Sequence, residues 1–316
     1  MNGIDWEVVL SVLLSGAVIG AVPLMVAALG EAIAERAGLL NLGIEGMMLG
    51  GAFFAVHAAA ETESLVGGLL AGTGTGLAMG LLFGVLTISF RVDQVVVGLA
   101  ITLFAGGLTG FLARDLYDGH ATAPTSAPDL AIPGLSQIPV VGPALFDQSL
   151  LVYLTWALVP ICAFLLGKTR FGLNLRAVGE YPFAADAAGV DVARVRYAAI
   201  TIAGTMAGFA GAFLCLGDLS FFEPGITVGQ GFIALALAMV GGWRPYRIAV
   251  GALVFGLLRS LKTGLGIAGV EIQPDFLAMI PYIGILIALV VLAGRTALPA
   301  ALGMPYARNR GRSARE

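Results

Sequence analysis

The chain has 316 residues, of which 58% are hydrophobic and 12% are charged, with 45 glycines and a formal net charge of −3. Together with a mean hydropathy of +0.94, this composition excludes an ordinary water-soluble domain, in which about a quarter of the residues are charged. We therefore predict an all-α, multi-pass integral membrane protein and expect no nucleic-acid partner.

Apolar runs long enough to form membrane-spanning helices recur along nearly the whole chain. A helix that crosses the ~30 Å hydrocarbon layer needs about 20 mostly apolar residues. We predict about nine spans, with a range of eight to ten because the run at 229–242 is short for a crossing. The predicted spans are 8–30, 39–60, 65–90, 94–113, 149–167, 198–217, 229–242, 248–264 and 276–294. The first run lacks a preceding basic segment, which favours a retained span over a cleaved signal peptide.

The basic residues predict an orientation, because Lys and Arg concentrate in the cytoplasmic loops of membrane proteins. With the N-terminus outside, only Arg114 of the 17 basic residues lies in an outer loop, and Arg259 and Lys262 lie within a span. All the others fall on the cytoplasmic side. The prediction is a single transmembrane domain, 1–316, with an extracytoplasmic loop at 114–148, a cytoplasmic loop at 168–197 and a basic cytoplasmic tail at 295–316. The outer loop is either a connector or a contact surface for a delivery protein.

The second span contains polar side chains in a glycine-rich run, GLLNLGIEGMMLGG at 38–51. Asn41 and Glu45 are four residues apart and therefore lie on one face of a helix. An ionisable group at membrane depth costs at least ~2.5 kcal/mol, so it usually faces the bundle interior or an aqueous path. The glycines favour a kinked or partly unwound helix. Glu45 is the only acid well inside a predicted span. Three roles are open for it: a structural hydrogen bond, lining of a substrate path, or proton relay.

The third span carries a glycine at every fourth position. In lipid, close approach of helix backbones over small residues supplies much of the packing. This stripe therefore predicts a helix buried against a neighbour and does not indicate a ligand site. The glycines predicted to pack in this way are Gly68, Gly72, Gly76, Gly80 and Gly84.

Nothing in the chain indicates catalysis. The triplet GKT at 167–169 resembles the end of a phosphate-binding loop, but Cys162 stands where that motif requires its first glycine. There is no hydrolytic constellation, and His120 has no second ligand at metal-binding spacing. Both cysteines, Cys162 and Cys215, lie in apolar runs and are interpreted as small buried side chains. We expect no enzyme activity, no catalytic residue, no metal and no bound cofactor, so any energy for work must come from a partner.

The cytoplasmic loop contains a candidate helix of about two turns, PFAADAA at 182–188. Pro182 suits the first helical position and Gly189 suits the C-terminal stop. Such a helix is too short to be stable alone. Its small apolar face is suited to a groove in another protein, although it could also lie on the membrane surface.

The short run at 229–242 contains Gln230 and is predicted to run opposite to the Asn41–Glu45 segment. The first four spans are likewise antiparallel to the last four. This arrangement resembles that of transporters whose substrate path lies between two inverted halves with short or broken helices. Asn41, Glu45 and Gln230 are therefore the candidate substrate-path residues.

Several segments resemble permease subunits of ATP-binding-cassette importers for branched-chain amino acids, simple sugars and nucleosides. RAVGEYPFAADAAGV resembles the coupling loop of that group. ERAGLLNLGIEGMMLGGAFFA resembles a segment of its nucleoside and sugar branch, and the NLGIEGMM form is closest to nucleoside permeases. FFEPGITVGQGFIALALAMVGGWRP and MIPYIGILIALVVLAG resemble the remaining blocks. The resemblance covers nearly all of 20–294.

The resemblance implies a bacterial cytoplasmic-membrane importer that takes up nucleosides, with simple sugars or branched-chain amino acids as alternatives. It implies three partners: a cytoplasmic ATPase that uses ATP and Mg, an extracytoplasmic binding protein, and a second homologous permease, this chain being similar to the shorter of the two. The matched coupling residues are Gly179, Glu180, Pro182, Ala184, Ala185, Ala188 and Gly189. A proton- or sodium-coupled secondary transporter is the alternative of another class.

Overall fold

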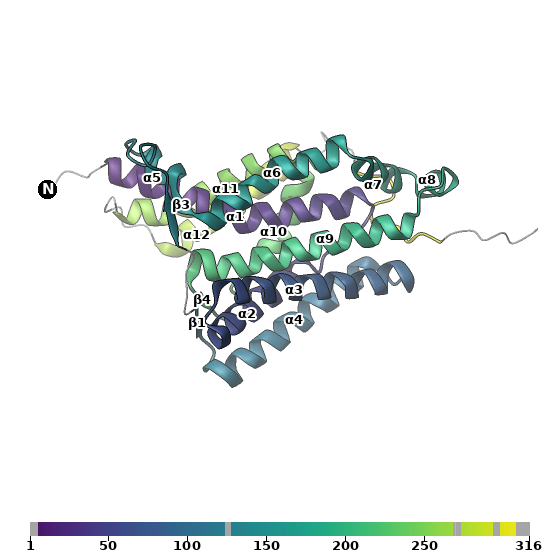
Figure 1. Ribbon diagram of the computed structural model, residues 1–316, viewed down its shortest axis with the longest axis horizontal. Coiled ribbons are helices and arrows are strands. Elements are labelled where there is room, and N and C mark those ends of the chain that lie inside the picture. The colour runs from purple at the N-terminus through teal and green to yellow at the C-terminus, as the bar shows by residue number, and fades with distance from the viewer. Residues whose placement is uncertain (1–5, 124–127, 268, 270–272, 293–297, 308–316) are drawn as a thin grey trace, which may run out of the picture.

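The structure is a computed structural model that describes residues 6–123, 128–267, 269, 273–292 and 298–307. Helices dominate it, as predicted (Figure 1). The helices and helical segments are α1 (Trp6–Arg36), α2 (Ile44–Thr62), α3 (Leu65–Gly84) with the π-helical turn η1 (Val85–Ser89), α4 (Gln94–Tyr117), α5 (Val141–Phe146), α6 (Leu150–Lys168), α7 (Arg170–Glu180), α8 (Pro182–Ala187), α9 (Val192–Phe213) with the π-helical turn η2 (Leu214–Leu219), α10 (Gln230–Val240), α11 (Pro245–Ile267) and α12 (Pro274–Leu292).

Two small antiparallel ladders lie in and beside the outer loop, which the sequence had indicated only as a loop. One joins β1 (Ala121–Thr122) to β4 (Phe221–Phe222), and the other joins β2 (Asp129–Ala131) to β3 (Asp147–Ser149). The outer loop is therefore tied to the segment that follows η2.

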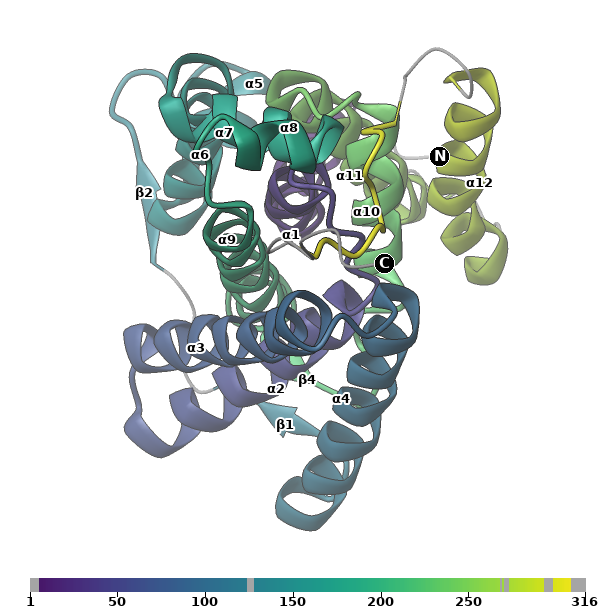
Figure 2. The same cartoon turned by 90° about the vertical axis from the view of Figure 1, so that its right-hand side faces the viewer.

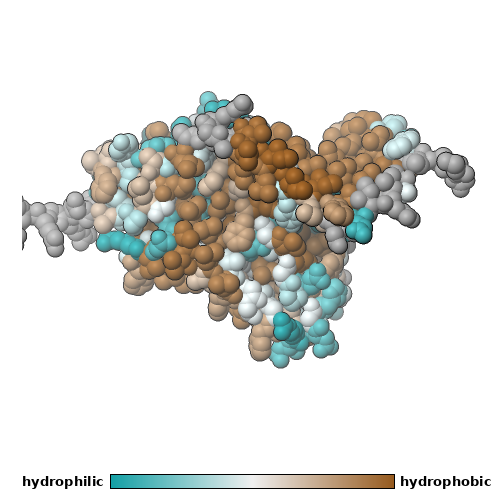
Figure 3. Space-filling view, turned by 180° about the vertical axis from the view of Figure 1, so that it is seen from behind, coloured by the Kyte–Doolittle hydropathy of each residue, from teal (hydrophilic) through white to brown (hydrophobic). Residues whose placement is uncertain are grey.

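Six helices are long and apolar enough to cross a membrane: α1, α3 with η1, α4, α6, α9 with η2, and α11. The other three predicted spans fall on α2, α10 and α12, of which α10 has only 11 residues. The multi-pass helical fold is thus confirmed, whereas the predicted number of about nine crossings is not. Large apolar side chains such as Leu103 and Val290, which are 75% and 77% exposed, face outward. Figure 3 shows such hydrophobic surface across the middle of one face.

Helix α1 is the centre of the molecule (Figure 2), where it packs against α9, α10, α11 and α6. Its residues from 20 to 35 are all buried. Helices α2, α3 and α4 form a second layer on the other side of α9. Helices α7 and α8 lie at one end of the molecule, and α5 lies at the opposite end (Figure 1).

The glycines of α3 lie against backbone in the structure. A Cβ atom added at Gly76 would collide with the carbonyl oxygen of Gly204, and one at Gly72 would lie 2.6 Å from the carbonyl oxygen of Gly51. Gly68, Gly80 and Gly84 are buried in the same stripe. Helix α3 therefore approaches α9 and α2 at backbone-to-backbone distance.

We expect Gly76→Leu to separate α3 from α9 and to lower both the yield and the thermal stability of the purified protein, since an overpacked contact costs at least about 1–3 kcal/mol. Gly74→Leu is the matched control, because a Cβ at exposed Gly74 meets nothing within 4 Å. Equal melting temperatures for the two variants in detergent would contradict the close packing of α3 on α9.

Candidate functional site

The connection between α1 and α2 is an irregular segment inside the helical bundle. Helix α1 ends in a left-handed turn at Gly38, with φ +82. In this turn the Leu39 amide donates to the Ala34 carbonyl at 3.1 Å and the Gly38 amide donates to the Glu35 carbonyl at 2.9 Å. A Cβ at Gly38 would lie 2.9 Å from the Ala301 carbonyl oxygen. Both the positive φ and the close approach therefore require glycine at this position.

Side chains satisfy the backbone of this irregular segment, as the membrane interior requires. Glu31 on α1 accepts from the Asn41 amide at 3.1 Å and from the Asn41 side-chain nitrogen at 3.3 Å. Gln94, at the start of α4, accepts from the Leu40 amide at 2.7 Å. The Thr102 hydroxyl donates to the Leu42 carbonyl at 3.1 Å. This irregular segment, the α1–α2 break (residues 37–43), is thus held by α1 on one side and by α4 on the other.

Glu45, in the first turn of α2, accepts three hydrogen bonds from the start of α10. Its Oε1 receives the Thr227 hydroxyl at 2.5 Å and the Gly229 amide at 2.9 Å, and its Oε2 receives the Gly231 amide at 2.7 Å. The first amides of a helix have no partner within the helix and carry partial positive charge. A residue in the first turn of α2 therefore accepts from the N-terminal end of α10, and only 8% of the Glu45 surface is exposed.

The two helices that meet at Glu45 run apart from it. Helix α2 contacts β1 of the outer loop and β4, which follows η2. Helix α10 has 11 residues, or about 16 Å at 1.5 Å per residue. It ends in the turn where the Trp243 indole donates to Glu35 and where Arg36 donates to the Gly242 carbonyl at 3.4 Å. Glu45 consequently lies about half a membrane thickness from the end of the molecule that holds α7 and α8.

Glu31 and Glu35 correct the prediction that Glu45 is the only acid well inside a span. Helix α1 continues to Arg36, beyond the predicted end at residue 30, and both acids are fully buried. The predicted span 8–30 therefore left out the last turn and a half of α1, which contains both acids. The partners that allow burial, Asn41 and Trp243, follow in later segments, and the only local signal was the helical spacing of the two acids in EAIAER.

The candidate path residues Asn41 and Gln230 each keep a side-chain oxygen unpaired. Within the described part of the chain, neither Asn41 Oδ1 nor Gln230 Oε1 has a hydrogen-bond partner, although Asn41 is 0% and Gln230 7% exposed. A buried polar atom without a partner costs about 1–3 kcal/mol, so such atoms are usually paired. These two buried amide oxygens are therefore acceptors that the described residues leave unused.

The residues matched to the coupling loop lie at the end of the molecule opposite α5 (Figure 1). Helix α8 has Pro182 at its first position and stops at Gly189, whose φ is +88. The Val190 amide donates to the Ala185 carbonyl at 2.9 Å, and Gly189 donates to Asp186 at the same distance. Ala185 faces inward, whereas Ala184 and Ala188 are exposed. Helix α8 thus presents small side chains outward.

Helix α7 was not predicted, and it contains two of the candidate coupling residues. Gly179 and Glu180 end α7 and do not begin α8. Gly179 lies directly against the Arg36 carbonyl oxygen, where no Cβ would fit. The Glu180 carboxylate receives the Ala300 amide at 3.4 Å. These two residues therefore join α7 to the end of α1 and to the chain at 298–307.

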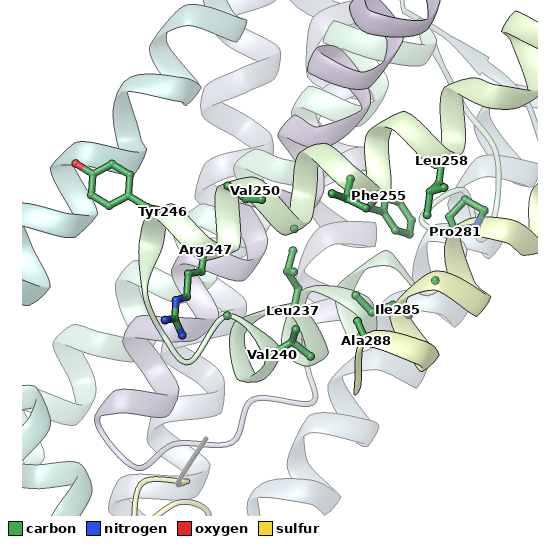
Figure 4. Close-up of a pocket in the computed structure, with 14 residues that line it drawn as sticks. Leu237, Val240, Tyr246, Arg247, Val250, Phe255, Leu258, Pro281, Ile285 and Ala288 are labelled. Atoms are coloured by element: carbon green, nitrogen blue, oxygen red, sulfur yellow. The ribbon is translucent and has the colours of Figure 1, made fainter. Parts of the chain in front are cut away.

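An apolar groove of about 840 Å³ lies between α10, α11 and α12 (Figure 4). Leu237, Phe255 and Ile285 line it together with other apolar residues, and Arg247 and Tyr246 lie at one end. A site for a polar small molecule needs several convergent polar groups. The groove lacks them, so the α1–α2 break and the start of α10 remain the candidate site.

Comparison with known proteins finds permease relatives over most of this chain. The chain is 37% identical to the guanosine ABC transporter permease protein NupQ of Bacillus subtilis, over 94% of this chain and 97% of NupQ. It is 34% identical to the nucleoside ABC transporter permease protein NupC of Lactococcus lactis subsp. cremoris, over 95% and 98%. It is 41% identical to the putative glucose ABC transporter permease protein TsgC13 of Haloferax volcanii, over 79% and 76%.

The chain is also 28% identical to the guanosine ABC transporter permease protein NupP of Bacillus subtilis, over 75% of this chain and 70% of NupP. It is 26% identical to the nucleoside ABC transporter permease protein NupB of Lactococcus lactis subsp. cremoris, over 77% and 70%. No solved structure matches it. A family model described as the permease component of the branched-chain amino acid transport system matches residues 13–295, and the chain therefore belongs to this family of ABC transporter permease subunits.

Proposed function

We propose that this permease subunit translocates nucleosides across the cytoplasmic membrane of its cell, driven by ATP that a partner subunit hydrolyses. The observation that carries the proposal is the end-to-end similarity to NupQ and NupC, which covers 94–95% of this chain. The similarity to TsgC13 is higher in identity but covers only 79%. Glucose, or another simple sugar, is therefore the second candidate substrate.

The partners follow from the same relatives. This chain resembles both permeases of two transporters, which supports pairing with a second, homologous permease chain. The absence of a nucleotide-binding motif in the sequence leaves ATP and Mg to a cytoplasmic ATPase, and an extracytoplasmic binding protein delivers the substrate.

The N-terminus lies outside, and α2, α10 and α12 complete nine membrane segments, with α2 and α10 starting inside the membrane.

The chemistry of the break suits an uncharged, hydrogen-bonding substrate. A nucleoside carries hydroxyl and ring N–H donors but no charge, so it needs acceptors rather than a counter-ion. The free amide oxygens of Asn41 and Gln230 are such acceptors. Glu45 is occupied with Thr227, Gly229 and Gly231 and acts by holding the start of α10 in place. We infer that its role is positional and that Asn41 and Gln230, which are buried in this structure, accept hydrogen bonds from the substrate when the bundle opens around them.

The substrate assay uses the purified complex of both permeases and the ATPase in proteoliposomes, with the binding protein on the opposite side. We expect labelled guanosine to accumulate when ATP is present, and unlabelled nucleosides but not glucose to compete with it. Accumulation of glucose with no competition by guanosine would transfer the assignment to sugars.

Glu45→Gln should lower ATP-driven uptake roughly 10-fold, because the amide nitrogen of Gln must face one of the donors that the carboxylate now accepts. Glu45→Ala should lower it at least about 100-fold, since three donors, two of them buried, then lose their acceptor. Initial uptake rates at equal protein measure both effects. Glu61→Gln is the matched control, because Glu61 is an exposed acid near the end of the same helix. Normal uptake by Glu45→Ala would remove the carboxylate from the mechanism.

Three buried acids, Glu31, Glu35 and Glu45, make the proton-coupled alternative worth an explicit test. The proposal requires wild-type uptake to persist when an uncoupler is added at constant ATP. Uptake by this chain alone, driven by a pH or sodium gradient without the ATPase, would show that it is a secondary transporter.

The coupling role of α8 can be tested at its glycine stop. Gly189→Val forces a β-branched side chain into φ +88 and should shift the end of α8 by strain of about 1–3 kcal/mol. We expect substrate-stimulated ATP hydrolysis to fall at least about 5-fold while membrane insertion is retained. Gly134→Val is the control: Gly134 has φ +84, and a Cβ there also meets nothing within 4 Å, but it lies in the outer loop. Equal ATPase activity in the two variants would contradict the coupling role.

A further inference from the structure

The first part of the C-terminal tail folds back onto the bundle. Residues 298–307, the C-terminal segment, run across the end of the molecule that holds α7 and α8 (Figure 2). The Ala301 amide donates to the Gly179 carbonyl of α7 at 2.8 Å, and the Gly303 amide donates to the Gly38 carbonyl at 3.1 Å. Two residues of the segment therefore bond to the coupling region and to the α1–α2 break.

A buried arginine joins the same elements. Arg196 lies in the second turn of α9, just after the coupling loop, and is only 2% exposed. Its Nε donates to the Ala37 carbonyl at 3.2 Å, and its Nη1 donates to the Met304 carbonyl at 3.0 Å. The rigid guanidinium fork spans two acceptors in a way that the single ammonium of lysine does not. Arg196 thus connects α9, the α1–α2 break and the C-terminal segment.

An aromatic contact connects the segment to α8 itself. The ring centroids of Phe183 and Tyr306 lie 5.2 Å apart, with an interplanar angle of 59°. Phe183 is otherwise 61% exposed, and Met304 and Leu298 in the segment are 59% and 57% exposed. The outward face of α8 and the C-terminal segment are therefore parts of one surface.

We infer that the C-terminal segment transmits movement of α7 and α8 to the α1–α2 break, with Arg196 as the positioning residue. The inference rests on the proposed function, in which an ATPase displaces the coupling helix. Ala301 of the segment bonds to Gly179, and Gly303, two residues later, bonds to Gly38. Gly38 begins the irregular stretch that leads to Asn41 and Glu45. A displacement at α7 and α8 is thereby delivered to the residues that face the substrate.

The decisive quantity is the amount of substrate transported per ATP hydrolysed by the reconstituted complex. In Arg196→Gln, ATP hydrolysis should remain within about 2-fold of wild type, and transport per ATP should fall at least about 10-fold. Arg196→Lys should be intermediate. Arg194→Gln is the control, because Arg194 lies two residues earlier on α9, its side chain is 88% exposed, and it pairs with surface Asp191. If Arg196→Gln leaves the amount of substrate transported per ATP unchanged, the residue is merely structural and the inference is wrong.

A second set of variants avoids the risk of unfolding that a buried arginine carries. Phe183→Ala and Tyr306→Ala change a partly exposed contact, and each should lower transport per ATP about 3- to 10-fold without changing thermal stability. The double variant should be no worse than either single one, because both remove the same contact. Multiplied effects, or no effect, would contradict transmission through this pair.

Failure of the inference can be told apart from failure of the proposed function. No ATP-driven uptake by the wild-type complex would contradict the proposed function. The segment is tested independently by hydrogen exchange of the permease chain alone. There, Arg196→Gln should speed exchange in the peptides that cover 36–43 and 298–307 at least about 10-fold relative to Arg194→Gln, because opening becomes easier. Unchanged exchange in 36–43 would show that the segment does not hold the break.

Discussion

The structure depends on one buried carboxylate that joins two helix starts inside the helical bundle. Glu45 belongs to the first turn of α2 and accepts from Thr227, Gly229 and Gly231 at the start of α10. Without it, a short helix would begin in an apolar layer with unpaired amides, which lipid cannot satisfy. The negative charge is in turn stabilised by the partial positive charge of two helix N-termini. Burial of the acid and interruption of the helices therefore require each other.

The same requirement explains the elements around this carboxylate. Glu31 and Gln94 supply acceptors to the irregular backbone between α1 and α2, and Trp243 pairs with Glu35 where α10 turns into α11. Glycines allow the close approach: a Cβ at Gly231 would lie 2.6 Å from the Glu45 Cα. The amide oxygens of Asn41 and Gln230 remain available within this framework. In the proposed function, these acceptors are the ones that a polar, uncharged substrate would use.

Patterns local in the sequence predicted local structure well. The glycine spacing of α3 indicated the face that meets backbone, and Pro182 and Gly189 bracketed α8. Features that depend on distant partners were missed. Glu31 fell outside the predicted span 8–30, and its partner, Asn41, lies beyond the turn that ends α1. Thr227 and Trp243 gave no signal of their roles, since each pairs with an acid roughly 180 to 210 residues away. The tail at 295–316 was expected only as a basic extension, yet residues 298–307 bond to α7 and to the α1–α2 break.

Substituted-cysteine accessibility tests most directly whether the substrate path passes the α1–α2 break and the start of α10. Cysteine is placed at Gln230 or, for comparison, at Val254 in the apolar groove, after replacement of Cys162 and Cys215. Labelling by a small, charged thiol reagent is then followed in the assembled complex with and without guanosine. We predict that guanosine slows labelling at position 230 and does not slow labelling at position 254. Protection at position 254, with position 230 unreactive throughout, would place the path in the groove and contradict the role of Glu45 and its neighbours.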